Sequence, residues 1–453
     1  MKTSDWLTDA FFEASPRGSV DGGTTSIGDL WHSVSPRWGH SMHTMCSYHG
    51  MFPAKVARYF IQRYSRPNDL VLDPFSGRGT TALQARVDGR RAICNDLNPL
   101  AYVLSRAKVA PPSWESVNAF VDGLEKAYWA SPYTSPDVSS DIRMLYHDNT
   151  LKQICFVRQR LLSKPFTEWT KEELMTGGSL AGIMHGAWRR DDTSQYLSIS
   201  MPNTFSMSPA YVEKFIRENG LKKIDQDVFE CLRAKLARLY LDDPNGLEGK
   251  AYQSDASDLL KGRSIPPGSV DLVVTSPPYL QVVNYGTSNW IRLWLFGVDG
   301  VGREQGEGRR QINEALDHRH TYDSYCEFMH RTMSGIERVL RRDGVAVVVI
   351  GDVKDPEKDE PLSLAAQMWH DIQDRTELRL LEIIEDDLPV HNKVSRIWGD
   401  TKGQATSRDC ALVLARRDGE PDLSRTDVEW DEPYKDGGPD AAHERLRTLR
   451  TAA

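Results

Sequence analysis

Apolar runs rich in β-branched residues recur along the chain, and each ends at a turn or a polar residue. The clearest run, residues 270–274, follows the turn residues Pro266, Pro267 and Gly268 and is typical of a buried parallel strand. Residues 70–99 predict a strand–helix–strand unit, and further strands are expected near 251–255 and over 345–350, 378–384 and 410–415. Strands that alternate with helices indicate an α/β fold with a largely parallel sheet.

Helical periodicity fills the stretches between the expected strands. Residues 322–340 form the most amphipathic stretch, which we expect to end at Asp343 and Gly344. Helical spacing within residues 47–64 predicts a helix with Pro53 at its start, and other helices are expected over residues 114–129, 150–162, 210–219 and 362–372. No strand pattern interrupts the helices between residues 110 and 249, so we predict a mainly helical insert, far longer than an ordinary connection between strands.

The run at 270–274 leads directly into Thr275, Ser276, Pro277, Pro278 and Tyr279. Consecutive prolines have no N–H for a sheet ladder, so this segment must leave the sheet at the carboxyl end of its strand, where open α/β sheets bind ligands. The prolines fix the backbone between a hydroxyl group and an aromatic ring. Such a site accepts hydrogen bonds from an amino group while a planar base stacks on the ring. The alternative interpretation is a plain proline-rich turn.

A second segment, residues 71–81 (VLDPFSGRGTT), turns from a strand into a helix through Gly77 and Gly79. Two glycines one residue apart permit a tight turn and the close approach of a ligand to the backbone. The segment lacks the third glycine of the dinucleotide fingerprint and the Lys-Ser/Thr pair of a phosphate loop, which argues against NAD and ATP. The next strand ends at Asp96, a position from which a carboxylate holds ribose hydroxyls.

The segments DPFSGRGTT, NDLNP and TSPPY together resemble motifs I, II and IV of S-adenosylmethionine-dependent DNA amino-methyltransferases. Residues 49–55 (HGMFPAK) resemble motif X of that family, and residues 254–256 resemble motif III. The resemblance covers residues 45–110 and 250–415, and it implies a Rossmann-like seven-stranded methyltransferase sheet that binds S-adenosyl-L-methionine. It implies cofactor contacts by Phe52, Pro53, Asp73, Pro74, Phe75, Ser76, Gly77, Gly79, Thr80, Thr81, Asp96, Leu97, Asp255, Ala256 and Thr275, and catalysis by Ser276, Pro277, Pro278 and Tyr279. For Asp255, a surface carboxylate that opens a helix is the alternative.

The SPPY form of the catalytic motif is associated with N4 methylation of cytosine. The resemblance therefore implies transfer of a methyl group to the exocyclic N4 of cytosine in double-stranded DNA by base flipping. An N6-adenine DNA methyltransferase is the first alternative, and an RNA amino-methyltransferase or a non-catalytic DNA-recognition subunit are others. The resemblance also allows a restriction or defence component as a further partner.

The expected organisation has five parts, with the catalytic domain split by the insert. These parts are an N-terminal arm (1–45), the cofactor motifs (46–109), the helical insert with target recognition (110–249), the catalytic motif with the remaining strands (250–417) and an acidic tail (418–453). The insert lies between the second and third strands, whereas the family pattern places it after the third. This departure leaves open which segment reads the DNA bases.

Charge and cysteine content limit where DNA can bind and which classes of methyltransferase fit the sequence. The formal net charge of the 453 residues is −8, so any positive surface that binds DNA must be confined to part of the protein. The candidate DNA-binding residues are Arg189 and Arg190 in the insert and Arg309 and Arg310 after a glycine-rich loop. The six cysteines form no Cys-x-x-Cys pair, so no metal site is expected, and none follows a proline, which argues against the C5-cytosine methyltransferases. No apolar run approaches a membrane span and the N-terminus is no secretory signal, so we expect a cytoplasmic protein.

Overall fold

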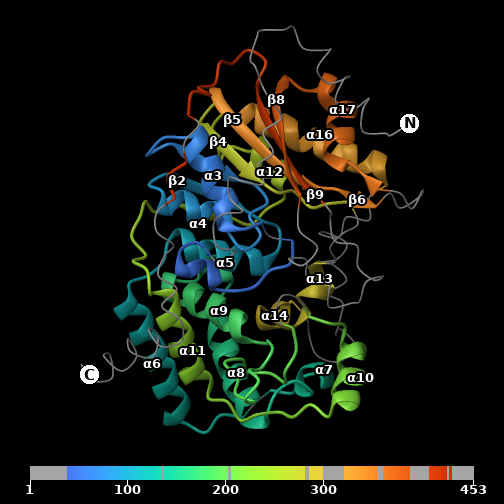
Figure 1. The fold of residues 1–453 in the computed structure, drawn as a ribbon. Helices are drawn as coiled ribbons and strands as arrows, with labels where there is room; N and C mark the ends of the chain where they lie inside the picture. The colour runs from blue at the N-terminus through green and yellow to red at the C-terminus, as the bar shows by residue number, and fades with distance from the viewer. Residues whose placement is uncertain are drawn as a thin grey trace.

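The computed structural model describes residues 38–430 except 51, 135, 203–205, 281–284, 299–320, 355–360, 388–407 and 426–427. Within these residues a seven-stranded sheet occupies the upper part of Figure 1, in the order β3-β2-β1-β4-β5-β9-β8. Its strands are β1 (Leu70–Asp73), β2 (Arg91–Asn95), β3 (Lys250–Tyr252), β4 (Val270–Thr275), β5 (Leu340–Gly351), β8 (Leu378–Asp387) and β9 (Arg408–Arg416). The strands from β3 to β5 are parallel, whereas β9 is antiparallel to both β5 and β8. The expected Rossmann-like seven-stranded sheet is confirmed.

Helices cover both faces of this sheet. One face carries α3 (Ala54–Tyr64), α4 (Thr80–Val87) and α5 (Pro99–Val109), and the other carries α12 (Ala256–Lys261), α16 (Tyr322–Val339) and α17 (Leu364–Ile372). Successive side chains of β4 alternate between the two layers: Val273 packs in the core beneath α16, and Val274 packs in the core beneath α3. Because both faces are buried, the strand reads as a continuous apolar run.

The insert forms a helical body below the sheet in Figure 1. Its helices are α6 (Trp114–Ala130), α7 (Ser140–Arg143), α8 (Asp148–Leu161), α9 (Lys171–Ile183), α10 (Pro209–Asn219) and α11 (Val228–Leu239), with a short 3-10 helix at Phe166–Glu168. Two helices that follow the TSPPY segment, α13 (Tyr285–Ser288) and α14 (Trp290–Leu295), join this body, as does the 3-10 helix at Ser41–Thr44. Small remaining elements are β6 (Val353–Lys354), β7 (Pro361–Leu362) and a 3-10 helix at Gln373–Arg375.

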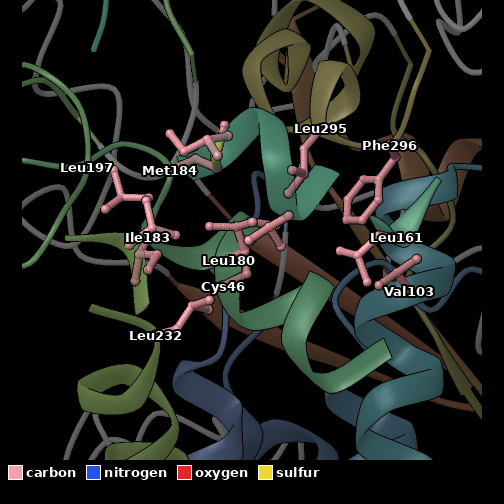
Figure 2. Close-up of a cluster of buried hydrophobic side chains, with 14 of the residues drawn as sticks. Cys46, Val103, Leu161, Leu180, Ile183, Met184, Leu197, Leu232, Leu295 and Phe296 are labelled. Carbon is pink, nitrogen blue, oxygen red and sulfur yellow. The ribbon is translucent and has the colours of Figure 1, made fainter. Parts of the chain in front are cut away.

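Helix α9 is the centre of the helical body. Figure 2 shows Leu180 and Ile183 of this helix among side chains from several other elements, including Leu232 of α11 and Leu295 of α14. Its packing is close, since a Cβ at Gly182 would lie 1.9 Å from the carbonyl oxygen of Met45. The same core contains residues of α5, so the insert and the first half of the sheet layer share one hydrophobic interior.

Buried cations hold the segment before α3 against the helical body. Arg292 is fully buried, and its Nε and Nη1 atoms donate hydrogen bonds to the carbonyl oxygens of Ala181 (3.2 Å) and Ser47 (2.9 Å). Lys235 donates from Nζ to the carbonyl oxygen of Thr44 (2.7 Å), and burial lowers its pKa to about 7. Because two of these contacts join segments far apart in the sequence, the N-terminal segment and the insert depend on each other structurally.

Two boundaries differ from the expectations. Helix α16 ends at Val339, and Asp343 and Gly344 lie within β5 instead of closing the helix. The cause is a register shift between β4 and β5, which keeps Leu340 paired with Val270 ahead of the regular ladder. Strand β3 ends at Tyr252, so Asp255 lies three residues beyond the strand and not within its expected range. Helix α3 begins at Ala54, directly after Pro53, where its start was expected.

Part of the C-terminal tail is packed. Trp430 meets Trp38 edge to face at 5.4 Å, and the carbonyl oxygen of Glu429 accepts hydrogen bonds from Nε (3.0 Å) and Nη2 (2.8 Å) of Arg58 in α3. These residues therefore close over the face of the sheet that carries α3. Among the helices of the described residues, none is both long enough and apolar enough to cross a membrane.

Candidate active site

The carboxyl ends of the parallel strands surround a crevice that is open to solvent on one side. Predicted site residues from four separate segments line it: Pro74, Phe75, Gly77, Asp96, Leu97, Asp255, Ala256, Ser276 and Pro278. The first and the last of these segments are far apart in the sequence. The topology unites them because β1, β2, β3 and β4 are parallel neighbours and end at the same edge of the sheet.

Asp96 lies at the centre of the cofactor side of this crevice. Its Oδ2 atom accepts the backbone N–H of Gly77 (2.8 Å), and its Oδ1 atom accepts the backbone N–H of Asn98 (2.9 Å). Burial raises the pKa of this carboxyl to about 6, although the backbone donors oppose the rise. A carboxylate has about four acceptor sites, so two N–H groups leave acceptors for the hydroxyl groups of a ligand.

Asp73 lies beneath the crevice and does not line it. It is buried, and its Oδ1 atom accepts hydrogen bonds from the Thr275 hydroxyl (2.7 Å) and the Phe75 backbone N–H (3.1 Å). The pair therefore ties the carboxyl end of β1 to the carboxyl end of β4. Burial raises the pKa of Asp73 to about 7. Both residues were predicted to contact the cofactor; in the structure they support the two motifs from beneath the crevice.

The other buried residues of the first motif also support the turn. The Ser76 N–H donates to the carbonyl of Asn95 (2.8 Å), and its hydroxyl lies 3.0 Å from that of Ser105. Thr80 and Thr81 are buried in the first turn of α4. None of the three lines the crevice.

The two glycines of the first motif have different roles. Gly77 (φ +50°) lines the crevice, whereas Gly79 (φ +77°) precedes α4 and faces α5. A Cβ at Gly79 would lie 2.9 Å from Oγ and 3.0 Å from Cα of Ser105. Left-handed backbone geometry and packing against α5 therefore both require glycine at position 79.

The catalytic segment is only partly open to the crevice. Ser276 and Pro278 line it, Pro277 is buried, and Tyr279 packs against the core on the α16 side. The Ser276 hydroxyl donates to the Tyr279 hydroxyl oxygen at 3.1 Å. The ring of Tyr279, which was expected to stack on a base, is therefore not part of the crevice lining in this structure.

Aromatic rings from other segments line the crevice instead of Tyr279. Tyr48 and Tyr285 face each other with ring centroids 6.1 Å apart, and Phe75 meets Phe328 of α16 edge to face at 5.8 Å. All four line the crevice. Of these, only Phe75 was predicted, because the other three follow no cofactor motif and lie far apart in the sequence.

Polar residues that sequence reasoning missed hold the motifs in register. The Asn95 side-chain amide donates to the carbonyls of Pro74 (3.1 Å) and Ser254 (3.0 Å), and its oxygen accepts from the backbone N–H of Ser254 (3.1 Å). The Asn98 amide donates to the Tyr48 hydroxyl oxygen (2.9 Å). Gly50 completes the lining.

Asp255, Pro53 and Phe52 are the remaining residues that were predicted to contact the cofactor. Asp255 is exposed and lines the crevice, and as the N-cap of α12 it accepts a hydrogen bond from the Ser257 N–H at 2.8 Å. Its position is therefore compatible both with a cofactor contact and with the alternative of a surface carboxylate that opens a helix. Pro53 is an exposed residue preceding α3, and Phe52 packs at the edge of the core beneath α3. Neither of the last two lines the crevice.

The candidate DNA-binding arginines lie away from this crevice or outside the described residues. Arg189 and Arg190 are exposed in a loop between α9 and α10, where the Arg189 N–H donates to the Thr193 carbonyl (2.9 Å). Arg309 and Arg310 fall in residues 299–320, outside the described part. Across the described residues no group of three or more His, Cys, Asp or Glu side chains is placed to hold a metal ion.

Parts of the chain are similar to known DNA methylases. Residues 10–105 match the N6/N4 methyltransferase family described as DNA methylase. The type II methyltransferase M.MvaI of Kocuria varians is 23% identical over 261 residues, which cover 52% of this chain and 53% of that protein. M.PvuII of Proteus hauseri is 41% identical over 56 residues, or 12% of this chain and 16% of that protein.

A solved structure, a putative DNA modification methylase of Thermus thermophilus in complex with S-adenosyl-L-methionine, is 19% identical over 38% of this chain and 54% of its own, with a TM-score of 0.22. The description of the fold rests on the strand order of the sheet and not on this likeness. The chain spans about half the length of M.MvaI, so the activity and substrate of a whole protein do not follow from these matches. Residues 10–105 are thus similar to the N6/N4 DNA methylase family, and the matches are the same for N4 and N6 methylation.

Proposed function

We propose that this protein transfers a methyl group from S-adenosyl-L-methionine to the exocyclic N4 of cytosine in double-stranded DNA. The observation that carries the proposal is that Ser276 and Pro278 line the same crevice as Asp96 and Gly77. A methyl donor held at the ends of β1 and β2 would therefore lie beside an amino group held at the end of β4. Proximity of this kind supplies a large part of the rate of a two-substrate reaction.

On the donor side, the residues present fit the cofactor. Asp96 has acceptor sites for two ribose hydroxyls, and the edge-to-face pair of Phe75 and Phe328 supplies an apolar surface for a purine ring. Gly77 keeps the backbone of the turn open to the ligand. When bound, the cofactor supplies an electrophilic methyl group on a sulfonium centre.

On the acceptor side, Ser276 is prepared as a hydrogen-bond acceptor. Its hydroxyl hydrogen is directed to the Tyr279 oxygen, so the lone pairs of Ser276 Oγ remain for an N–H of the target amine. The carbonyl of Pro277 is the second acceptor that we assign. Two acceptors favour a pyramidal amine and stabilise the positive charge that develops on nitrogen during transfer. No covalent enzyme intermediate is required.

A base reaches this crevice only after it leaves the duplex, which costs a few kcal/mol in lost stacking and pairing. The facing rings of Tyr48 and Tyr285 supply an aromatic surface at the crevice, and we assign to them the stacking role that Tyr279 was expected to have. Tyr279 then acts through Ser276 and positions its hydroxyl group.

The choice of cytosine rests on Ser276. A serine hydroxyl is short and both donates and accepts, which suits an amino group beside a ring nitrogen acceptor. The test is to methylate unmodified duplex DNA with purified protein and S-adenosyl-L-methionine, digest it to nucleosides and identify the product by mass spectrometry. We expect N4-methyldeoxycytidine. N6-methyldeoxyadenosine alone would refute the cytosine assignment, and methylated RNA with unmodified DNA would refute the substrate class.

A further inference from the structure

Helix α10 (Pro209–Asn219) packs on the helical body through Val212, Phe215 and Ile216, and most of its other side chains are exposed. It lies at the lower right edge of the helical body in Figure 1, and Val212 is its one buried residue. The Ser208 hydroxyl caps its first turn by accepting the Tyr211 N–H, and Gly220 ends it with a φ of +57°. The helix is thus well defined by its caps while its sides remain accessible to a partner.

The accessible surface of α10 combines aromatic rings with cations. Tyr211 is 41% exposed and stacks on Phe215 one turn later, with ring centroids 6.2 Å apart and an interplanar angle of 19°. Residues 209–223 contain four exposed cations and two carboxylates, in a chain whose net charge is −8. The cations are Lys214, Arg217, Lys222 and Lys223.

The carboxylates do not cancel this local charge. Lys214 lies 3.7 Å from Glu218, but the two side chains are 60% and 55% exposed, so water and salt screen the pair and leave the lysine able to change partners. The segment therefore offers a positive surface beside aromatic rings. This combination is typical of nucleic-acid contacts, because phosphates select cations and bases or sugars pack on rings.

The entry to α10 is hydrogen-bonded to the segment that carries the crevice residue Tyr285. The Ser206 N–H donates to the Ser288 carbonyl at the end of α13 (2.6 Å). The indole N–H of Trp290, the first residue of α14, donates to the Met207 carbonyl (2.7 Å). Helix α10 therefore begins beside the short helix that starts at the crevice, which places it within reach of DNA whose base occupies the crevice.

We propose that α10 is the element of the insert that contacts double-stranded DNA next to the flipped base; this inference rests on the proposed function. Lys214 and Arg217 of α10 and Lys222 just after it bind backbone phosphates, and the Tyr211–Phe215 pair packs against the exposed sugar and base edges. Lys223 donates from Nζ to the carbonyl oxygen of Arg143 (2.7 Å) and adds positive charge beside them. Target recognition by the insert thus depends on α10 more than on Arg189 and Arg190.

The first test is the salt dependence of DNA binding by the full chain carrying Lys214→Ala and Arg217→Ala. Each phosphate contact contributes roughly 0.9 to the slope of log K against log salt, so we expect the slope to fall by about 2. The matched control is Lys261→Ala with Arg263→Ala. Both residues are exposed, and they lie at and just after the C-terminal end of α12, whereas Asp255 caps its N-terminal end. The control should keep the wild-type slope. An unchanged slope in the α10 variant would overturn the proposal.

The second test addresses the aromatic pair. Tyr211→Ala should lower kcat/KM for DNA by roughly tenfold, the loss of a weak stacking contact, while the affinity for S-adenosyl-L-methionine stays constant. Tyr211→Phe should restore activity, because the ring is what contacts DNA. If Tyr211→Ala methylates DNA at the wild-type rate, the aromatic surface serves another partner, such as a protein, and the proposal is wrong.

Different results would refute the proposed function and the role of α10. Wild-type protein that binds S-adenosyl-L-methionine but methylates no DNA would refute the proposed function. Wild-type protein that methylates DNA, with α10 variants that match it in salt slope and in kcat/KM, would refute the assignment of α10 alone.

Discussion

The ionisation of Asp96 should control the affinity for S-adenosyl-L-methionine. The carboxylate form has acceptors for both ribose hydroxyls, whereas the protonated form has lost one of them to a hydrogen. With a pKa of about 6, roughly a tenth of the free protein carries the ionised form at pH 5 and nearly all of it does at pH 8. The dissociation constant should therefore rise roughly tenfold between pH 8 and pH 5, because only the ionised fraction binds.

Asp96→Asn removes both the charge and the titration. Its amide nitrogen would face one of the two backbone N–H groups, from Gly77 or Asn98, that the carboxylate now accepts. Hydrogen bonds to a charged group contribute about 1.5–3 kcal/mol, so we expect binding at pH 8 to weaken by roughly 10- to 150-fold. The remaining affinity should not depend on pH.

Isothermal titration calorimetry at intervals between pH 5 and pH 8 measures both effects. Asp255→Asn is the matched control, since this exposed carboxylate lines the same crevice, and the variant should keep the tenfold loss at low pH. A wild-type affinity that is flat over this range, or an Asp96→Asn protein that binds as tightly as wild type, would refute the reasoning.

Three further predictions concern stability. Burial raises the pKa of Asp73 from 3.8 to about 7, so the folded state binds an extra proton between these pH values. The free energy of unfolding should therefore fall as pH rises from 4 to 7, by roughly 4 kcal/mol at most. Asp73→Asn should remove this fall in urea titrations, and a pH dependence of stability equal to that of wild type would contradict the prediction. Gly79→Ala should destabilise the protein at least about 1 kcal/mol more than Gly89→Ala, because both have φ near +78° but only the first meets a neighbour; equal melting temperatures would argue against the packing role. Arg292→Leu removes the two hydrogen bonds from its buried guanidinium to the carbonyls of Ala181 and Ser47, and it should cost about 2–5 kcal/mol by urea unfolding. The exposed Arg190→Ala should change stability by less than about 0.5 kcal/mol, and similar values for the two variants would be inconsistent with the buried contacts.

Strands were predictable where both of their faces are buried. Residues 272–274 and 345–350 are continuous apolar runs because helices cover both sides of β4 and β5. Helix α9 was not predicted, and the reason is similar. Residues from Leu174 to Ile183 are all buried, so the helix has no polar face to mark its period.

The motifs predicted which segments meet at the site, but not which side chains face the ligand. Asp73 and Gly79 follow the family pattern, yet their side-chain positions point into the protein, toward Thr275 and Ser105. Tyr48 and Tyr285 reach the crevice from segments without a cofactor motif. Contacts of this kind depend on tertiary packing over long sequence separations, which local patterns do not encode.

Buried cations were equally beyond prediction. Arg292 and Lys235 would be placed at the surface from their residue type, since charged side chains are rarely fully buried. The structure places them against backbone carbonyls of the segment before α3. Their partners are main-chain atoms, which leave no mark in the sequence.

The most direct test of the account is a single-turnover transfer of labelled methyl groups from S-adenosyl-L-methionine to duplex DNA, with Ser276→Ala measured beside the wild type. Wild-type protein should transfer the label to DNA. Ser276→Ala should bind the cofactor with unchanged affinity and transfer the label roughly 100-fold more slowly, the usual cost of losing one hydrogen-bonding group that stabilises developing charge. Wild-type protein that leaves duplex DNA unlabelled, or Ser276→Ala protein that transfers at the wild-type rate, would contradict the account.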